Sequence, residues 1–313
     1  MSLWPWLEPA AAQLRGARAA NRLPSALLVH EAPGTGAAAL ARLFAQLRFC
    51  TATDVPCGQC THCRRVAQGE HPDFVTVVPD EKSKLGQIIV EQVRDLAQQL
   101  SLSSYEGRGT VLVIQPAEAL NRNAANALLK TLEEPRPDAH LILITATPSL
   151  LPATIRSRCQ KLTVAAPDRA MALDWLNARQ PQRRADWPAV LDVLGVAPLE
   201  AASADVDRLL AIRADIDRLL EEAARGRLDV IRAAQGWAGD DLPLRLAGLE
   251  NCLTQRLLTM RADSRLPGAV PDINMASSLR LLSEVGELRR QLAAASLNKP
   301  LAVERVLWRL QRG

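Results

Sequence analysis

Strand-like and helix-like segments alternate along roughly the first 165 residues, and this alternation constrains the fold more than any other feature of the sequence. Between the strand-like runs, apolar residues recur at helical spacing, as at Leu40, Leu43, Phe44 and Leu47. A further helix is expected from Asn123 to Glu133. Alternating β and α segments predict a parallel sheet in an α/β domain, with strands that are apolar on both faces. We expect buried strands at 26–30, 74–78, 110–115, 141–145 and 161–164.

Strand signals end near Pro167, and the remaining segments carry helical patterns only. With 313 residues the chain is long enough for two or three domains. We predict an α/β domain over 1–166, a small helical domain over 167–203 and a C-terminal helical domain over 204–313. Helices are expected at 170–179, 187–194, 205–224, 228–235, 242–260, 275–295 and 301–310.

The composition is that of a soluble globular protein, with 48% hydrophobic and 23% charged residues. No apolar run reaches the roughly 18 residues that a membrane-spanning helix needs. The first residues lack the basic and apolar regions of a secretory signal, so we predict a cytoplasmic location. A net charge of +4 is too small to indicate nucleic-acid binding by itself.

The first strand-like run is followed by a segment in the position of a phosphate-binding loop, G-x-x-x-x-G-K-[ST]. Gly36 matches the second glycine of the motif and Gly34 lies within the loop, but Glu31 replaces the first glycine. Ala37 replaces the lysine and Ala38 replaces the hydroxyl residue that binds Mg²⁺. Glu31 adds a negative charge where phosphates would lie. The loop is therefore predicted to be degenerate, and a glycine turn that never bound a nucleotide is the alternative.

The run at 110–115 ends where a Walker B motif would place two acidic residues. Gln115 and Pro116 stand there instead, so the Mg²⁺ ligand and the water-activating carboxylate are both missing. Nothing in the sequence suggests that Glu118 or Glu133 substitutes for them, and we expect Glu133 to be a solvated helix residue. Two independent losses favour a degenerate ATPase.

Four of the six cysteines lie within 14 residues, at positions 50, 57, 60 and 63. Zn²⁺ takes four tetrahedral ligands, and closely spaced cysteines suit that geometry. We predict a structural zinc module with Cys50, Cys57, Cys60 and Cys63 as ligands. Free thiols or a redox pair are the alternatives, and His62 is expected to point away from the thiols.

A Ser-Arg-Cys sequence, residues 157–159, follows the fourth predicted strand. Taken alone, an arginine in such a turn most often pairs with a surface carboxylate. Cys159 is expected to pack as a small buried thiol.

With these residues established, the chain resembles the clamp-loader AAA+ family. The segments that carry the resemblance span most of the first 165 residues in family order, and the second-last and last are the most specific. They are Arg-Leu-Pro-Ser-Ala at 22–26, Cys-Gly-Gln-Cys-Thr-His-Cys at 57–63, Gly-Glu-His-Pro-Asp at 69–73, Asn-Ala-Leu-Leu-Lys-Thr-Leu-Glu-Glu-Pro at 126–135 and Leu-Pro-Ala-Thr-Ile-Arg-Ser-Arg-Cys at 151–159.

The resemblance implies a RecA-like AAA+ domain with an inserted zinc module, a helical lid and a helical collar that mediates oligomerisation. It implies a non-catalytic subunit of the DNA polymerase III clamp loader, which places a sliding clamp on primed DNA. Its partners would be the ATPase subunits gamma/tau and the delta subunit, and no intrinsic ATP hydrolysis is expected. Arg158 matches the family's arginine finger, which reaches ATP held by a neighbour. The alternatives are an active gamma/tau-like ATPase and a zinc-containing DNA-binding protein.

Overall fold

The computed structural model describes residues 3–79, 86–101, 104–263, 275–292 and 298–312. Contacts within the chain divide it into two compact units, Met1–Pro167 and Asp168–Gly313. Each unit is described separately. None of the helices in the described ranges is both long and apolar enough to cross a membrane.

The first unit contains a five-stranded sheet in the order β2-β3-β4-β1-β5. All four neighbouring pairs are parallel, which confirms the predicted parallel sheet. The inner strands β3 and β4 are buried along their whole length, whereas the edge strand β5 alternates between exposed and buried residues. The strands are β1 (Ala26–Glu31), β2 (Phe74–Val77), β3 (Thr110–Ile114), β4 (Ala139–Thr145) and β5 (Gln160–Val164).

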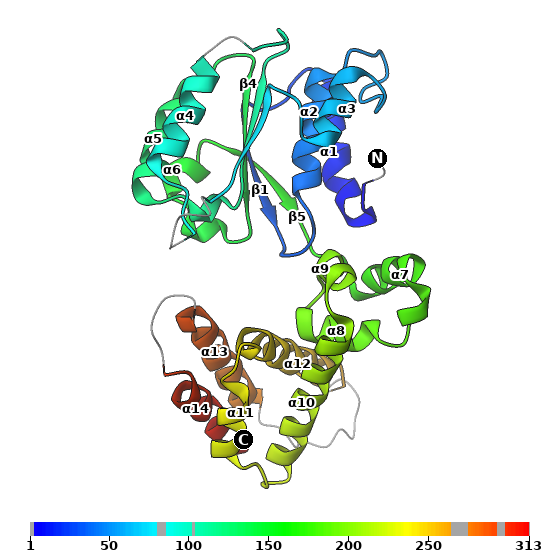
Figure 1. Ribbon diagram of the computed structural model, residues 1–313, viewed down its shortest axis with the longest axis vertical. Coiled ribbons are helices and arrows are strands. Elements are labelled where there is room, and N and C mark those ends of the chain that lie inside the picture. Colours follow the sequence, from blue (N-terminus) through cyan, green and yellow to red (C-terminus); the bar gives the residue numbers. More distant parts are fainter. Residues whose placement is uncertain (1–2, 80–85, 102–103, 264–274, 293–297, 313) are drawn as a thin grey trace. The chain divides into compact units, whose positions relative to one another are not determined.

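Helices cover both faces of this sheet (Figure 1). On one face lie α1 (Glu8–Ala19), α2 (Ala38–Phe49) and α3 (Thr61–Gln68), and on the other lie α4 (Val90–Ser101), α5 (Arg122–Glu133) and α6 (Ala153–Arg156). Helices α1, α3 and α6 were not predicted from the sequence. Three short 3-10 helices complete the unit, η1 (Pro5–Leu7), η2 (Ala117–Ala119) and η3 (Pro148–Leu150).

Side chains of α4 and α5 form a core with one face of the sheet. Leu96 and Leu128 pack with Leu112 and Leu141, and each of these four side chains is almost fully buried. The Asn121 side chain caps α5 by accepting a hydrogen bond from the Ala124 N–H at 2.8 Å. This cap explains why the helix begins directly after the loop that follows η2.

Among its described residues, the second unit contains helices joined by loops and no strand. A single apolar core joins its helices, with Trp187, Ile216 and Leu246 fully buried in it. The division into a lid at 167–203 and a collar at 204–313 stays a prediction, and residues 293–295 of one expected helix lie outside the described ranges. The helices are α7 (Arg169–Arg179), η4 (Pro181–Arg183), α8 (Trp187–Leu194), α9 (Pro198–Ser203), α10 (Val206–Ala224), α11 (Val230–Trp237), α12 (Leu242–Asp263), α13 (Met275–Leu292) and α14 (Lys299–Arg312).

Candidate functional site

The loop between β1 and α2 has the backbone form of a phosphate loop, but a side chain of this chain occupies its donor. Gly34 and Gly36 adopt positive φ angles of 74° and 78°, which glycine reaches without strain. The Ala37 N–H donates to Oε2 of Glu31 at 2.8 Å. The Thr35 hydroxyl lies 3.4 Å from the same oxygen. At the N-terminus of a helix such N–H groups normally bind phosphate, so the Glu31 carboxylate takes the role of an internal anion.

Burial raises the pKa of the Glu31 carboxyl, although the hydrogen bond from Ala37 opposes the shift. Glu118 adds to the increase, so the two carboxylates lie close enough to repel each other. The Ala146 N–H donates to Oε1 of Glu118 at 3.1 Å, which connects η2 to the end of β4. An incoming triphosphate would therefore meet the negative charge of Glu31 and Glu118. They lie at the carboxyl ends of the strands, where parallel α/β folds usually bind ligands.

A tryptophan that the sequence analysis did not single out also holds this loop. The Trp6 indole N–H donates to the Thr35 carbonyl at 2.8 Å, and both residues are buried. No local sequence signal links them, because 29 positions separate the two residues. The η1 segment therefore restrains the loop from outside.

The segment compared above with a Walker B motif lies at the carboxyl end of β3. β3 ends at Ile114, and Gln115 and Pro116 follow it. The Gln115 N–H donates to the Val77 carbonyl at 3.0 Å, which extends the pairing with β2 by one residue. Neither side chain offers a carboxylate for Mg²⁺.

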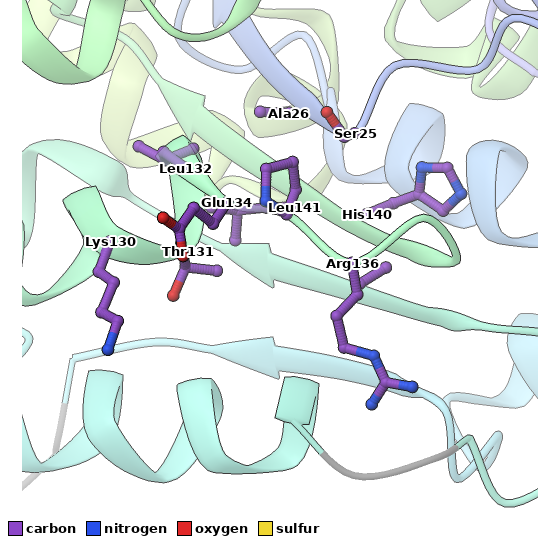
Figure 2. Close-up of a pocket in the computed structure, with 11 residues that line it drawn as sticks. Ser25, Ala26, Lys130, Thr131, Leu132, Glu134, Arg136, His140 and Leu141 are labelled. Carbon is purple, nitrogen blue, oxygen red and sulfur yellow. The ribbon is translucent and has the colours of Figure 1, made fainter.

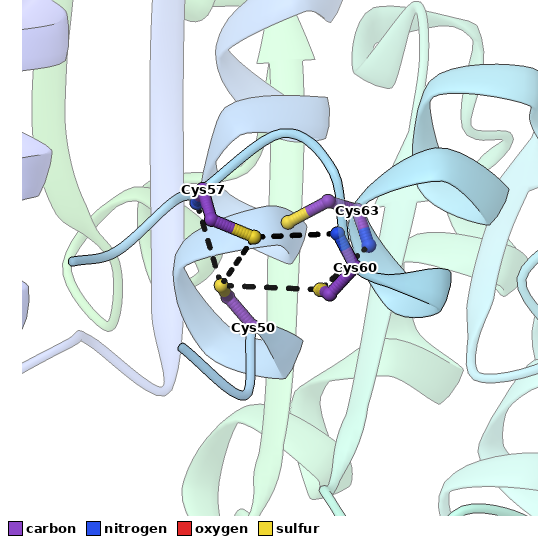
Figure 3. Close-up of side chains that lie close together, drawn as sticks. All are labelled: Cys50, Cys57, Cys60 and Cys63. Carbon is purple, nitrogen blue, oxygen red and sulfur yellow. Dashed lines mark hydrogen bonds between the residues drawn. The ribbon is translucent and has the colours of Figure 1, made fainter. Parts of the chain in front are cut away.

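The four clustered cysteines converge between the end of α2 and the start of α3 (Figure 3). The Sγ atoms of Cys50 and Cys57 are 3.6 Å apart, and those of Cys50 and Cys60 are 4.0 Å apart. A tetrahedral zinc ion with Zn–S bonds of 2.3 Å separates its sulfur ligands by about 3.8 Å. A disulfide would need about 2.05 Å, and all four cysteines are free. The thiols therefore fit a zinc ion.

Backbone N–H groups point at these sulfur atoms and favour the thiolate form that a metal requires. The Cys57 N–H donates to Cys50, and the Cys60 N–H donates to Cys57. Hydrogen bonds from the N–H groups of Cys60 and Gln59 lower the pKa of Cys57. Burial acts to raise the pKa of Cys60, but N–H donors including those of Cys63 and Thr51 outweigh it and bring that pKa to about 6. Burial raises the pKa of Cys63, so the thiolate form is favoured at Cys57 and Cys60 but not at Cys63.

His62 turns away from the thiols, in agreement with its expected orientation. Its Nδ1 lies 3.1 Å from Nε2 of His71 and 2.8 Å from Oε2 of Glu106. The Asp73 N–H donates to Nδ1 of His71, so the ring proton of neutral His71 is on Nε2. That nitrogen therefore has no free lone pair for a metal, and this group forms a hydrogen-bonded network beside the cysteine cluster.

The Ser-Arg-Cys turn follows α6, and it buries Cys159 but exposes Arg158. Cys159 is buried in the core, which confirms its expected packing, and burial raises its pKa to about 11. Arg158 is exposed, with 36% of its side chain accessible. Its Nη2 lies 2.8 Å from Oε1 of Glu133, and its Nη1 donates to the Thr154 carbonyl at 3.0 Å. Glu133 is half exposed as expected. Arg158 thus pairs with a surface carboxylate, as the turn taken alone predicted, although the sequence did not identify Glu133 as the partner.

A cavity of about 300 Å³ lies at the amino ends of the strands (Figure 2). The end of α5, the loop after it and the starts of β1 and β4 line this cavity, with Lys130, Arg136 and His140 among its residues. Ligands of parallel α/β sheets bind at the carboxyl ends of the strands, whereas this cavity is at the amino ends. It is therefore separate from the nucleotide position.

Comparison with known proteins identifies the family of this chain. Residues 6–168 match the family described as DNA polymerase III, delta subunit. A DNA polymerase III subunit delta' from Yersinia pestis is 35% identical over 265 residues, covering 82% of this chain and 77% of that protein. The subunit delta' of Escherichia coli (strain K12) is 30% identical over 331 residues, covering 99% of this chain and 96% of that protein.

Among solved structures, a gamma subunit-related protein of DNA polymerase III from Thermotoga maritima has a TM-score of 0.52. It is 17% identical and the alignment covers 96% of this chain and 99% of that one, a likeness that concerns the fold alone. The delta' relatives carry the assignment, because they match along most of both chains. The chain thus belongs to the family of DNA polymerase III delta' subunits.

Proposed function

We propose that this chain is a non-catalytic AAA+ subunit of the DNA polymerase III clamp loader and supplies Arg158 to ATP held by a neighbouring subunit. The observation that carries the proposal is the hydrogen bond between the Glu31 carboxylate and the Ala37 N–H, which fills the chain's own phosphate loop. Ala37, Ala38 and Gln115 offer no lysine, hydroxyl or carboxylate for Mg²⁺·ATP. A guanidinium exposed on the same unit can still act on another subunit's nucleotide.

An arginine finger works because its planar cation stabilises the negative charge that develops on the transferring phosphoryl group. The buried Cys159 beside Arg158 provides a rigid base for the exposed side chain. The ATP and Mg²⁺ would come from the neighbour. The contribution of this chain is the positive charge and its placement.

The zinc ion proposed for Cys50, Cys57, Cys60 and Cys63 is structural. Four thiolates complete a tetrahedral shell and leave no position for a reacting water molecule. The ion would hold the end of α2 against the start of α3, because Cys50 follows α2 and Cys63 lies in α3.

The proposed partners are gamma/tau and delta subunits, and through the assembled complex the sliding clamp and primed DNA. A cytoplasmic location belongs to the same proposal. The isolated chain is expected to turn over no ATP.

The test is ATPase activity of a loader reconstituted with wild-type chain or with Arg158→Ala. We expect the variant to assemble normally. At the neighbour's ATP site that Arg158 serves, the ATPase rate stimulated by clamp and primed DNA should fall by at least about 10³-fold. Lys161→Ala is the matched control, since it removes another exposed positive charge from the same edge of the sheet. An unchanged rate with Arg158→Ala, or turnover by the isolated chain, would refute the proposal.

A further inference from the structure

The side chain of Arg158 is held by its own subunit at two points. Its Nη2 faces Oε1 of Glu133 at 2.8 Å, and its Nη1 donates to the Thr154 carbonyl one helical turn earlier at 3.0 Å. Both terminal nitrogens are thus engaged, and the guanidinium folds back along α6. The side chain has to leave both contacts before it can extend towards a phosphate on another subunit.

The position of Glu133 points to a role for this contact. Glu133 is the last residue of α5, where the partial negative charge of the helix end disfavours a carboxylate. Glu134 follows it directly and adds a second negative charge. The Arg158 guanidinium offsets this unfavourable placement.

The contact is also easy to break. The Glu133 side chain is 51% exposed, so water can solvate its carboxylate once the guanidinium leaves. Exposed ion pairs of this kind shift an equilibrium by no more than about fivefold. The arginine can therefore exchange a carboxylate for a phosphate at a small cost in free energy.

We propose that Glu133 is a positioning residue that holds Arg158 in a retracted conformation until a neighbouring subunit presents its nucleotide. This inference rests on the proposed finger role of Arg158. The retracted form is populated in the free chain, and docking selects the released form. The apparent affinity of docking equals the intrinsic affinity multiplied by the fraction of chain in the released form, so a larger retracted population weakens docking.

The experiment titrates this chain into a loader lacking it and measures ATPase activity against its concentration. Glu133→Gln removes the charge and keeps the shape. We expect the half-saturating concentration to fall by about two- to fivefold, while the maximal rate stays within about twofold of wild type. Glu133→Asp keeps the charge and should restore the wild-type curve. Glu134→Gln, which neutralises the adjacent carboxylate, is the matched control and should leave the curve unchanged.

The outcomes separate the two proposals. An unchanged half-saturating concentration with Glu133→Gln, or a lower maximal rate, overturns the holding role even where Arg158→Ala abolishes stimulation. An Arg158→Ala variant with normal stimulation overturns the finger role itself. In the double variant, Glu133→Gln should have no effect, because the side chain that it releases is gone.

Discussion

The N-terminus and the C-terminus of helix α2 differ in the groups that lie against them. At its N-terminus the phosphate loop satisfies the Ala37 N–H with the chain's own Glu31 carboxylate. At its C-terminus Cys50 joins three other thiols whose spacing fits a zinc ion. The N-terminal end is completed from within the chain, whereas the C-terminal end offers four thiols that could hold an external ion.

The two ends also differ in the chemical groups that they offer. The loop has glycines with positive φ angles, but Ala37 and Ala38 stand where a phosphate loop has its lysine and hydroxyl residues. The cysteine cluster offers four thiol sulfur atoms. The helix between them is about 18 Å long, so the two ends can be altered independently.

The largest effect should come from removing the metal. We expect about one zinc per chain, and a chelator should lower the free energy of unfolding of the first unit by about 4 kcal/mol if zinc is held ~1,000-fold above its Kd. Elemental analysis and thermal unfolding measure both quantities. Cys159→Ala is the control, because this thiol lies outside the cluster and should leave the zinc content unchanged. A well-folded preparation without metal would contradict the Cys₄ site.

A smaller effect is expected from opening the other end of the helix. Glu31→Ala leaves the Ala37 N–H without its acceptor and should reduce stability by about 1–2 kcal/mol. Added sulfate should restore part of this loss by binding the freed N–H group. Glu31→Gln keeps an acceptor and should neither lose that stability nor respond to sulfate. Equal stability of all three proteins would show that the carboxylate does not complete the loop.

The smallest effect is the pH dependence of the loop. Burial raises the pKa of Glu31 in the folded chain above its ordinary value of 4.5, so protonation favours folding. Its stabilising contribution is complete below pH 4.5 and is lost as pH rises through the raised value. Wild type should therefore lose stability relative to Glu31→Gln as the pH rises above 4.5. Denaturant unfolding measured across this range checks the sign, and the opposite trend would mean that the N–H donors dominate.

The strands and half of the α-helices of the first unit could be predicted because their signals are local. Apolar runs placed all five strands, with bounds that differ from the structure by at most two residues. Helix α1 is rich in alanine and has few large apolar side chains, and it was missed. The cysteine cluster was predictable because its members are close in sequence.

The contacts that complete each site were not predictable, since they join residues far apart in the chain. Glu133 was expected to be merely solvated, and nothing within one helical turn of it indicated that Arg158 lies against it. The partnership of Trp6 with Thr35 is equally non-local. Such contacts depend on the packing of whole elements, which single-sequence patterns do not determine.

The indole of Trp6 has a practical consequence. Because its N–H is bonded to the Thr35 carbonyl, its fluorescence emission depends on the conformation of the neighbouring loop. A variant that keeps Trp6 and replaces the other five tryptophans would carry an intrinsic optical probe at the start of α2.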